Sequence, residues 1–436
     1  MIRPIGPSMR TAYVNARLLD PATGLDAHGA LLVEGARIAD LGPGLFRDGV
    51  PEGVSVEDCG GACLAPGLVD LRARTGEPGF ENNETILTAS AAAGAGGITA
   101  FAALPNTDPV IDDVAGLEFI ARRAREVKQV KIFALCALTR ETAGKELTEM
   151  GLLAEAGAVG FTDGVNPVAD PLIMRRALSY GSVWGKVIMQ RPEEPRLAGG
   201  AMNAGEIATR LGLPGVPRMA EIIMLERDLR LVEMTGGRYH ACNISTAESV
   251  EVVRRAKDKG LDVTCDTAPP YFALTEVDVG DYRTFFKLSP PLRDEMDRRA
   301  IVAGLADGTI DAIASDHQPH DQDSKRVPFN QAAFGAVGLE TLLPLTLELA
   351  HKGAMPLLKA LAAVTVAPAR ILGLPLGRLG VGQPADFVLF DPDRPWKVAA
   401  ERLLSKSKNS CFDKRPVQGM VLRTVVDGRT VYRRDA

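Results

Sequence analysis

The sequence predicts an α/β protein built on a (β/α)8 TIM barrel, with a small β-sandwich domain formed by both termini. Short apolar runs typical of strands alternate with amphipathic helices along residues 66–374. Such alternation indicates parallel βαβ units. The two ends of the chain, residues 1–65 and 375–436, contain short strands separated by Pro, Gly and Asp instead. We therefore expect a barrel domain over 66–374 and one composite β domain from the ends.

Eight apolar runs define the expected barrel strands. In chain order they are Ala65–Leu71, Ile98–Leu104, Val130–Ala137, Val159–Thr162, Val187–Gln190, Arg238–Ile244, Asp262–Cys265 and Asp311–Ser315. Segments with apolar residues at i, i+3 and i+4 lie between them and predict helices. These helices are Asp113–Glu126, Leu147–Ala156, Met219–Thr235, Ala247–Lys259 and Asp297–Leu305. Eight such units favour a closed barrel over an open, doubly wound sheet.

The terminal strands are expected to be short. At the start of the chain they are Thr11–Leu18, Ala30–Glu34, Arg37–Asp40 and Ser55–Cys59. Near the end, Ala385–Asp391 predicts a strand. Gly419–Asp427 and Thr430–Arg433 predict a hairpin with its turn at Asp427-Gly428.

Composition limits the class of protein. The chain has 436 residues, 46% of them hydrophobic and 24% charged, which excludes wholesale disorder. A net charge of −5 gives no electrostatic reason to expect nucleic acid or an anionic membrane as a partner. No apolar stretch is long enough to predict a membrane span, and no secretory signal is evident. The six scattered cysteines predict buried free thiols in a reducing cytoplasm.

Polar motifs follow the expected strands, and in such barrels the chemistry lies at the carboxyl ends of the strands. The first strand leads into Asp70-Leu71-Arg72-Ala73-Arg74-Thr75-Gly76-Glu77-Pro78-Gly79. Later motifs are Leu104-Pro105-Asn106-Thr107, Phe161-Thr162-Asp163, Ser245-Thr246-Ala247-Glu248-Ser249, Pro290-Pro291-Leu292-Arg293, Ser315-Asp316-His317 and Gly338-Leu339-Glu340-Thr341. Ala385-Asp386-Phe387-Val388-Leu389 closes the series.

Taken together and in this order, the motifs resemble those of the dihydroorotase family of the amidohydrolase superfamily, over essentially the whole chain. The resemblance implies a (β/α)8 barrel with a β-sandwich from the termini. It also implies zinc-assisted, reversible ring closure of carbamoyl aspartate in pyrimidine synthesis. By the same resemblance, Asn106, His320, Phe334 and Gly335 match substrate-binding positions.

The departures from the family pattern are as informative as the matches. The family has a His-x-His pair where this chain has Arg72 and Arg74, and zinc-binding histidines where it has Arg191 and Asn243. A carboxylate-binding Arg of the family is replaced by Gly76, and an Asn by Ser289. Two ligand-type positions survive, which are Asp163 and Asp316, the latter matching the family's proton acceptor.

These replacements predict the loss of the metal. Zinc takes neutral imidazole, thiolate or carboxylate ligands, whereas a guanidinium stays protonated and offers no lone pair. Without a metal, nothing lowers the pKa of a water molecule or polarises the ring carbonyl. We therefore expect no metal cofactor and no catalysis by the family's route.

Two alternatives concern the residues that remain. A single metal held by Asp163 and Asp316 with His317 or His320 is conceivable, while hydrogen-bonded loop histidines are the plainer interpretation. For the arginines, the leading hypothesis is that Arg72, Arg74 and Arg191 replace the metals by pairing with acidic groups. The acidic groups in reach of the expected mouth are Asp163, Glu193 and Asp316. The other two interpretations are that these arginines are solvated loop residues, or that they form a pocket for a carboxylate or phosphate.

Three functions remain open. The leading prediction is a non-catalytic dihydroorotase homologue that forms an oligomer with aspartate carbamoyltransferase, a partner implied by the resemblance alone. The second is an active cyclic-amide hydrolase with a reduced metal site. The third is an anion-binding regulator that uses the arginine cluster.

Overall fold

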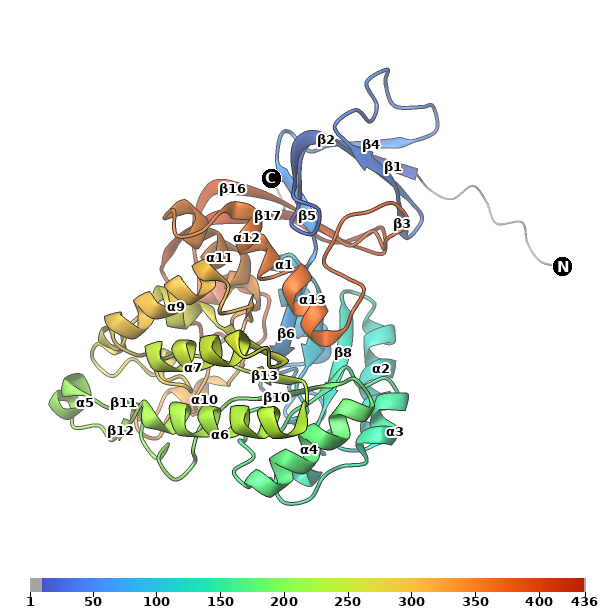
Figure 1. The fold of residues 1–436 in the computed structure, drawn as a ribbon. Coiled ribbons are helices and arrows are strands. Elements are labelled where there is room, and N and C mark those ends of the chain that lie inside the picture. The colour runs from blue at the N-terminus through green and yellow to red at the C-terminus, as the bar shows by residue number, and fades with distance from the viewer. Residues whose placement is uncertain (1–9, 435–436) are drawn as a thin grey trace.

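The computed structural model describes residues 10–434, which form two eight-stranded sheets and one two-stranded sheet, with helices around the barrel (Figure 1). One eight-stranded sheet is the barrel and the other is built from the two ends of the chain. The terminal sheet lies to one side of the barrel, next to α12 (Leu357–Ala362) and α13 (Val366–Leu372) (Figure 1). The predicted fold class is confirmed.

The barrel sheet has eight strands in the hydrogen-bonded order β15-β14-β13-β10-β9-β8-β7-β6, and neighbouring strands run parallel. The strands are β6 (Leu68–Ala73), β7 (Ile98–Ala103), β8 (Lys131–Cys136), β9 (Gly160–Phe161), β10 (Val187–Gln190), β13 (Tyr239–Ala241), β14 (Val263–Thr267) and β15 (Ala312–Ile313). Every residue of β6 and β7 is buried, as expected for parallel strands covered on both faces.

Two contacts bring the ends of this sheet together. The backbone N–H of Ser315 donates to the carboxylate of Asp70 at 2.7 Å, and the Ser315 hydroxyl donates to its second oxygen. A parallel bridge also joins Ala73 to His317. The first and last barrel strands therefore meet, and their carboxyl ends face one common mouth.

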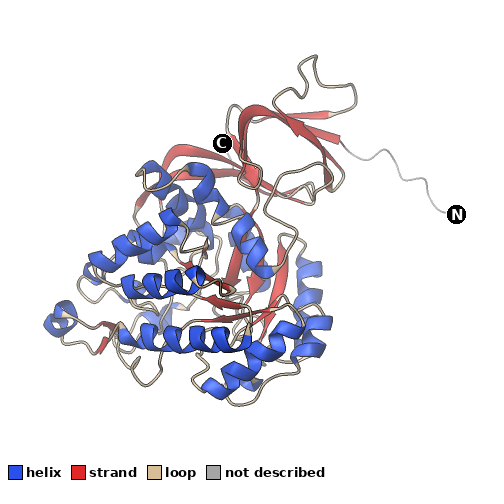
Figure 2. Cartoon of the chain, in the orientation of Figure 1, coloured by secondary structure: helices blue, strands red, loops and turns tan. Residues whose placement is uncertain are grey.

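Helices cover the outside of the strands (Figure 2). They are α1 (Ile86–Ala95), α2 (Val114–Val127), α3 (Met150–Glu155), α4 (Pro171–Val183), α6 (Met219–Thr235), α7 (Ala247–Asp258), α9 (Glu295–Asp307), α11 (Leu342–His351), α12 and α13. Several begin at a side-chain cap predictable from the sequence. Asp113 accepts from the N–H of Gly116 at α2, and Thr246 accepts from that of Ser249 at α7.

Shorter elements lie in the loops. They are α5 (Glu206–Leu211), α8 (Pro269–Ala273), α10 (Gln322–Lys325), the two-residue strands β11 (Met202–Asn203) and β12 (Gly215–Val216), and the 3-10 turns η1 (Arg140–Thr142), η2 (Glu276–Val279), η3 (Thr284–Phe286), η4 (Leu339–Thr341) and η5 (Ala400–Arg402). The segment with β11, α5 and β12 projects from the barrel (Figure 1).

The terminal sheet also has eight strands, in the order β18-β17-β16-β5-β1-β2-β3, with β4 paired to β1. They are β1 (Arg10–Asp20), β2 (Leu25–Glu34), β3 (Arg37–Gly42), β4 (Ser55–Asp58), β5 (Cys63–Pro66), β16 (Phe387–Lys397), β17 (Pro416–Val426) and β18 (Arg429–Arg433). Its own apolar core includes Tyr13, whose ring meets that of Phe387 edge-on at 4.9 Å. The expected hairpin is present, with Asp427 and Gly428 at positive φ in its turn.

The chain passes from the terminal sheet to the barrel between β5 and β6 and returns before β16. Lys131, at the start of β8, ties the two parts together, since its amine lies 2.8 Å from Asp427 and also pairs with Asp386. The domain limits of 1–65, 66–374 and 375–436 stay predictions. All six cysteines are free and buried, as the sequence indicated. Over residues 10–434, no helix combines the length and hydropathy needed to cross a membrane.

Candidate functional site at the barrel mouth

The carboxyl ends of the barrel strands surround two adjoining hollows, which share Val165, Arg191 and Gln318 in their linings. The inner one, here called the floor, is lined by Arg72, Asn243 and others. It has a volume of about 10 Å³. That is room for about one water molecule. The side chains themselves therefore fill the bottom of the mouth.

Arg72 occupies this floor. Its guanidinium donates from Nη1 and Nη2 to the two carboxylate oxygens of Asp266, on β14, and from Nη2 also to the side-chain carbonyl of Asn243. Both members of the ion pair are buried, with side-chain exposures of 5% and 0%. Burial works against the charge on Asp266, but Arg72 and His240 overcome it and lower the pKa of Asp266 to about 2. The same carboxylate raises the pKa of Arg72 against the effect of burial.

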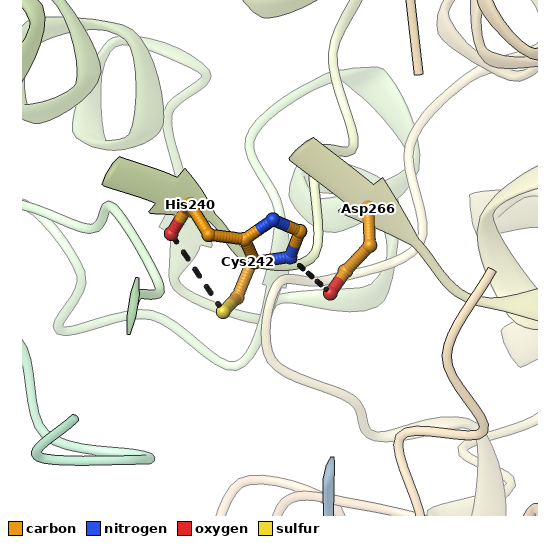
Figure 3. Close-up of side chains that lie close together, drawn as sticks. All are labelled: His240, Cys242 and Asp266. Carbon is orange, nitrogen blue, oxygen red and sulfur yellow. Dashed lines mark hydrogen bonds and ion pairs between the residues drawn. The ribbon is translucent and has the colours of Figure 1, made fainter. Parts of the chain in front are cut away.

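One group of metal-type donors is found among residues 10–434, and it includes Asp266 of this pair. His240, Cys242 and Asp266 bring one ligand atom each within 4.8 Å of one another (Figure 3). His240 Nε2 is 2.9 Å from an Asp266 oxygen, and His240 Nδ1 is 2.8 Å from the hydroxyl of Thr264. Burial raises the pKa of the Cys242 thiol to about 12.

These donors do not fit a zinc ion. A zinc ligand must be deprotonated and free to bind, yet both ring nitrogens of His240 have partners and the Cys242 thiol keeps its proton. Both oxygens of Asp266 accept from a guanidinium, so a metal would have to displace a cation already in place. The chemistry of the donor set therefore disagrees with the metal that the family pattern implies.

Asp163 is buried but does not face an arginine. Its carboxylate accepts from the backbone N–H of Thr139 at 2.8 Å and from the Thr139 hydroxyl. Burial raises its pKa to about 6. Asn106 braces the same loop, because its amide donates to the carbonyl of Asp163 at 3.0 Å and accepts from the N–H of Val165 at 3.2 Å. Asp163 and Asn106 therefore stabilise the conformation of the loops around them.

Asp316 does lie at the floor. It has a positive φ of 48°, and one carboxylate oxygen is 3.1 Å from the side-chain amide of Gln318 and 3.8 Å from Nε of Arg72. His317 points elsewhere, with Nε2 3.3 Å from a Glu84 oxygen and Nδ1 accepting from Gly338. Among the described residues, Asp163, Asp316 and His317 or His320 are not gathered within ligand distance of one another, so the structure gives no support to a single metal held by them, and this alternative stays a prediction.

Arg191 follows β10 and links three loops. It donates to the carbonyl of Val165 at 2.6 Å and to that of Ser289 at 3.2 Å, and it lies 3.2 Å from the carboxylate of Glu193. Within residues 10–434, its buried Nε has no hydrogen-bond partner. The expected pair of Arg191 with Glu193 is present.

Arg74 departs from the expectation of a carboxylate partner. Among residues 10–434, its guanidinium forms no hydrogen bond or ion pair, and it lies over the ring of Phe80, 6.0 Å from the ring centroid. Burial lowers its pKa. The prediction that all three arginines pair with Asp163, Glu193 or Asp316 is therefore wrong for Arg74. It is incomplete for Arg72, whose main partner is Asp266.

The remaining predicted substrate positions lie together beside the outer hollow. His320 Nε2 is 2.7 Å from the carbonyl of Phe334, and the ring of Phe334 lines the hollow. Burial, with the charges of Lys325 and Arg74, lowers the pKa of His320 to about 4. Gly335 has a φ of 122°, and its carbonyl accepts from Asn409 at 3.1 Å.

Sequence reasoning missed Asp266. The expected seventh strand ended at Cys265, whereas β14 continues to Thr267 and places Asp266 at the carboxyl end of a barrel strand. An Asp in that position is a signal for a site residue. Thr139, the partner of Asp163, carries no such signal, because its role depends on the path of a loop.

Comparison with known proteins agrees with this architecture. Residues 61–249 match the family described as Dihydro-orotase-like, and residues 214–431 match the Amidohydrolase family. A dihydroorotase of Wolbachia sp. subsp. Drosophila simulans (strain wRi) is 47% identical over 97% of this chain and 96% of its own length. One from Pelobacter propionicus (strain DSM 2379 / NBRC 103807 / OttBd1) is 44% identical over 98% of this chain and 100% of its own.

Among solved structures, the L-hydantoinase (dihydropyrimidinase) from Arthrobacter aurescens superposes with a TM-score of 0.85 at 25% identity. The alignment covers 97% of this chain and 96% of that one. The closed parallel barrel, with its polar mouth and β domain from both termini, is that of an amidohydrolase. Within that class, the chain belongs to the dihydroorotase family.

Proposed function

We propose that this chain is a non-catalytic member of the dihydroorotase family in pyrimidine biosynthesis and serves as a structural subunit for aspartate carbamoyltransferase. The observation that carries the first part is the buried, bidentate ion pair of Arg72 with Asp266. It places a permanent cation where the family pattern has a zinc-binding imidazole.

The energetics of this pair support the proposal. A buried ion pair is stable only while both partners stay, and removing one leaves an uncompensated charge. A zinc ion at the floor would have to share Asp266 with Arg72 or expel it, in a space of about 10 Å³. Repulsion between the two cations opposes the first course, and loss of the bidentate pair opposes the second.

Asp316 supports the same conclusion. Asp316 matches the position of the family's proton acceptor, a role that needs a metal-activated water beside it. Here it pairs with Arg72, with 3.8 Å between the Asp316 oxygen and Nε. Charge balance at the floor is therefore achieved within the protein, and no metal cofactor is proposed.

The partner rests on the resemblance to dihydroorotase-like chains that assemble with aspartate carbamoyltransferase. An oligomer of this kind, located in a reducing cytoplasm, would also suit a chain with six free, buried thiols. If selection acted only on the shape of the barrel, the fold would be preserved while the metal site was lost.

A second candidate function is an active dihydroorotase with a reduced metal site. The comparisons favour it, because relatives 47% and 44% identical over nearly the whole chain are named dihydroorotase. The two candidates differ in metal content and turnover.

The deciding experiment measures both quantities on one preparation. The chain is purified in zinc-supplemented medium, its metal is measured by mass spectrometry, and dihydroorotate hydrolysis is assayed by loss of absorbance. A dihydroorotase with an intact His-x-His pair, treated in parallel, is the positive control. We expect no retained zinc and no turnover; bound zinc together with turnover would establish the second candidate.

The assembly role has its own test. The chain is co-expressed with the aspartate carbamoyltransferase of the same organism, and the mass of any complex is measured by light scattering. We expect co-elution and a larger carbamoyltransferase assembly than that enzyme forms alone. Separate elution at micromolar concentrations would remove the structural role without affecting the result on catalysis.

A further inference from the structure

Two lysine amines are buried beside the barrel mouth. One belongs to the loop of residues 321–334, here called the rim loop, which contains α10 (Figure 1) and ends at Phe334 in the lining of the outer hollow of about 280 Å³. Lys325 of α10 and Lys287, directly after η3, are each 2% exposed. Within residues 10–434 both amines donate to backbone carbonyls and neither forms an ion pair. Buried charges normally have counter-ions, so these two amines require a physical explanation.

The hydrogen bonds of Lys325 match a neutral amine. Its Nζ donates to the carbonyl of Ala333, in the rim loop, at 2.6 Å and to that of Thr284, in η3, at 3.2 Å. A neutral amine has two N–H groups and both are then used, whereas an ammonium has a third that finds no acceptor in the described chain. The hydroxyl of Thr284 in turn donates to the carbonyl of Lys325 at 2.6 Å. The amine therefore joins the rim loop to η3 best without a charge.

Lys287 provides the neighbouring positive charge. Its amine lies 4.3 Å from the ring centroid of Phe334, an arrangement that stabilises a cation, and donates to the carbonyl of Asn330 at 2.9 Å. Burial lowers the pKa of Lys325 to about 7, and the charge of Lys287 acts in the same direction. Burial also lowers the pKa of Lys287. A proton on Lys325 would thus be a second positive charge in one buried place.

The other groups of this cluster keep their charge state near neutral pH. Cys411, which precedes β17, faces Lys325, and burial raises the pKa of its thiol to about 12. His320 follows β15, and burial with the charges of Lys325 and Arg74 lowers its pKa to about 4. Arg74 and Asp321 are the remaining charged groups that act on His320. Within this cluster, the amines are therefore the groups whose charge changes between about pH 7 and 10.

We propose that the rim loop is a pH-sensitive lid of the barrel mouth, closed by the neutral amine of Lys325 and released when this amine takes up a proton. Protonation places an unpaired N–H and a second cation beside Lys287, which favours expulsion of Lys325 into water. Release separates the loop from η3, exposes the buried Phe329 and moves Phe334 from the wall of the outer hollow. This device acts on access to the mouth whether or not the barrel is catalytic.

The direction of the pH effect follows from the two states of Lys325. In the released loop its amine has the ordinary pKa of 10.5, against about 7 in the closed loop. The closed loop is therefore favoured most above pH 10.5. As the pH falls from 10 to 7, the equilibrium constant for opening should rise about 10-fold per pH unit, and it should change little below 7.

Hydrogen exchange of the intact chain, read by mass spectrometry between pH 7 and 9, tests this behaviour. The exchange rate of a protected amide is its opening constant multiplied by a chemical rate that rises about 10-fold per pH unit. In peptides of the rim loop the two effects should cancel, so their rates stay nearly constant. Rates in peptides of α2 should rise about 10-fold per pH unit. A rise in both regions, or constant rates in both, would overturn the proposal of a local lid.

Variants then assign the effect to Lys325. Lys325→Met cannot take up a proton, so its rim loop should exchange about 10-fold faster per pH unit, as α2 does. Lys359→Met is the matched control, because the Lys359 amine also donates to a carbonyl, that of Ala306 at 2.6 Å, but lies on α12. It should keep the constant rates of the parent. Constant rates that persist in Lys325→Met would overturn the role of Lys325, and if that variant does not fold, the parent profile alone decides.

Discussion

Arg72 and Asp266 form a two-point ion pair across the inside of the barrel, between its first and seventh strands. The pair also organises its surroundings, because Asp266 accepts from His240 at 2.9 Å and from the backbone N–H of Asn243 at 2.7 Å. Asn243 has a positive φ of 56°, and its side chain accepts from Arg72. The Arg72 guanidinium therefore stabilises the charge of Asp266, the side-chain amide of Asn243 and the strained backbone of Asn243 together.

Removing this guanidinium should destabilise the protein strongly. Arg72→Met leaves Asp266 buried with no counter-ion, and we expect a loss of about 3–5 kcal/mol in the free energy of unfolding. Urea denaturation followed by circular dichroism measures it. Arg122→Met, at an exposed arginine on α2, should change the same quantity by less than about 0.5 kcal/mol. A loss below about 1 kcal/mol in Arg72→Met would show that the pair does not replace the metals structurally.

The same pair predicts the acid limb of the stability curve. The pKa of Asp266 is held at about 2 in the folded chain, against an ordinary value of 3.8. The stabilisation is thus present above about pH 4 and is lost as the pH falls towards 2, by about 2 kcal/mol. Asp70 and Asp163 act in a separate window, since burial raises the pKa of each to about 6. Their contribution to stability grows as the pH falls from 6 to 4 and is complete before the Asp266 step begins.

Unfolding by urea at several pH values between 2 and 7 measures this profile. Asp266→Asn removes the titrating group and should flatten the curve between pH 4 and 2 relative to the unchanged protein. If the two curves keep parallel slopes in that interval, the low pKa of Asp266 is not the source of the acid limb.

Sequence and structure agree best where local pattern decides the outcome. All eight barrel strands and helices such as Met219–Thr235 follow from periodicity and apolar runs. The replaced ligand positions could also be named from the sequence, because each motif fixes their distance from a strand end. Which charges pair was harder to foresee, since pairing joins residues 194 positions apart, as in Arg72 with Asp266. A strand end misplaced by one or two residues was enough to hide that partner.

Arg191 should also contribute to stability, through loops rather than strands. Arg191→Ala removes donors to the carbonyls of Val165 and Ser289 and leaves the buried Glu193 without its cation. We expect a loss of about 1.5–3 kcal/mol. Thermal melting compares it with Arg140→Ala, whose exposed pair with Glu146 at 3.4 Å should contribute less than about 0.5 kcal/mol. Equal melting of Arg191→Ala and the parent protein would count against structural replacement of the metals.

Arg74 should behave in the opposite way. Its guanidinium has no partner in the described chain, and burial lowers its pKa, so its charge is a cost to folding. Arg74→Gln should therefore leave the free energy of unfolding unchanged to within about 0.5 kcal/mol, or raise it. Urea denaturation without added anions measures this. A loss above about 1 kcal/mol would mean that Arg74 has a structural role, and the contrast with Arg72 would disappear.

The last prediction reverses the substitutions. A variant with Arg72→His, Arg74→His, Arg191→His and Asn243→His restores the imidazoles that the family pattern places at these strand ends. It also removes Arg72, the guanidinium that fills the floor and lies 3.8 Å from the Asp316 carboxylate. Zinc needs three or four such ligands, so we expect about one zinc ion per chain in this variant. Added zinc should also raise its melting temperature, because a ligand that binds only the folded state stabilises it.

The control for this variant places Gln at the same four positions, which removes the charges without supplying imidazoles. Metal content by mass spectrometry and melting with and without zinc distinguish the two proteins. If both remain free of zinc, the four positions do not converge as a metal site requires. If the unchanged chain already carries zinc, the buried pair of Arg72 with Asp266 does not exclude the ion, and the proposal of a non-catalytic barrel is wrong.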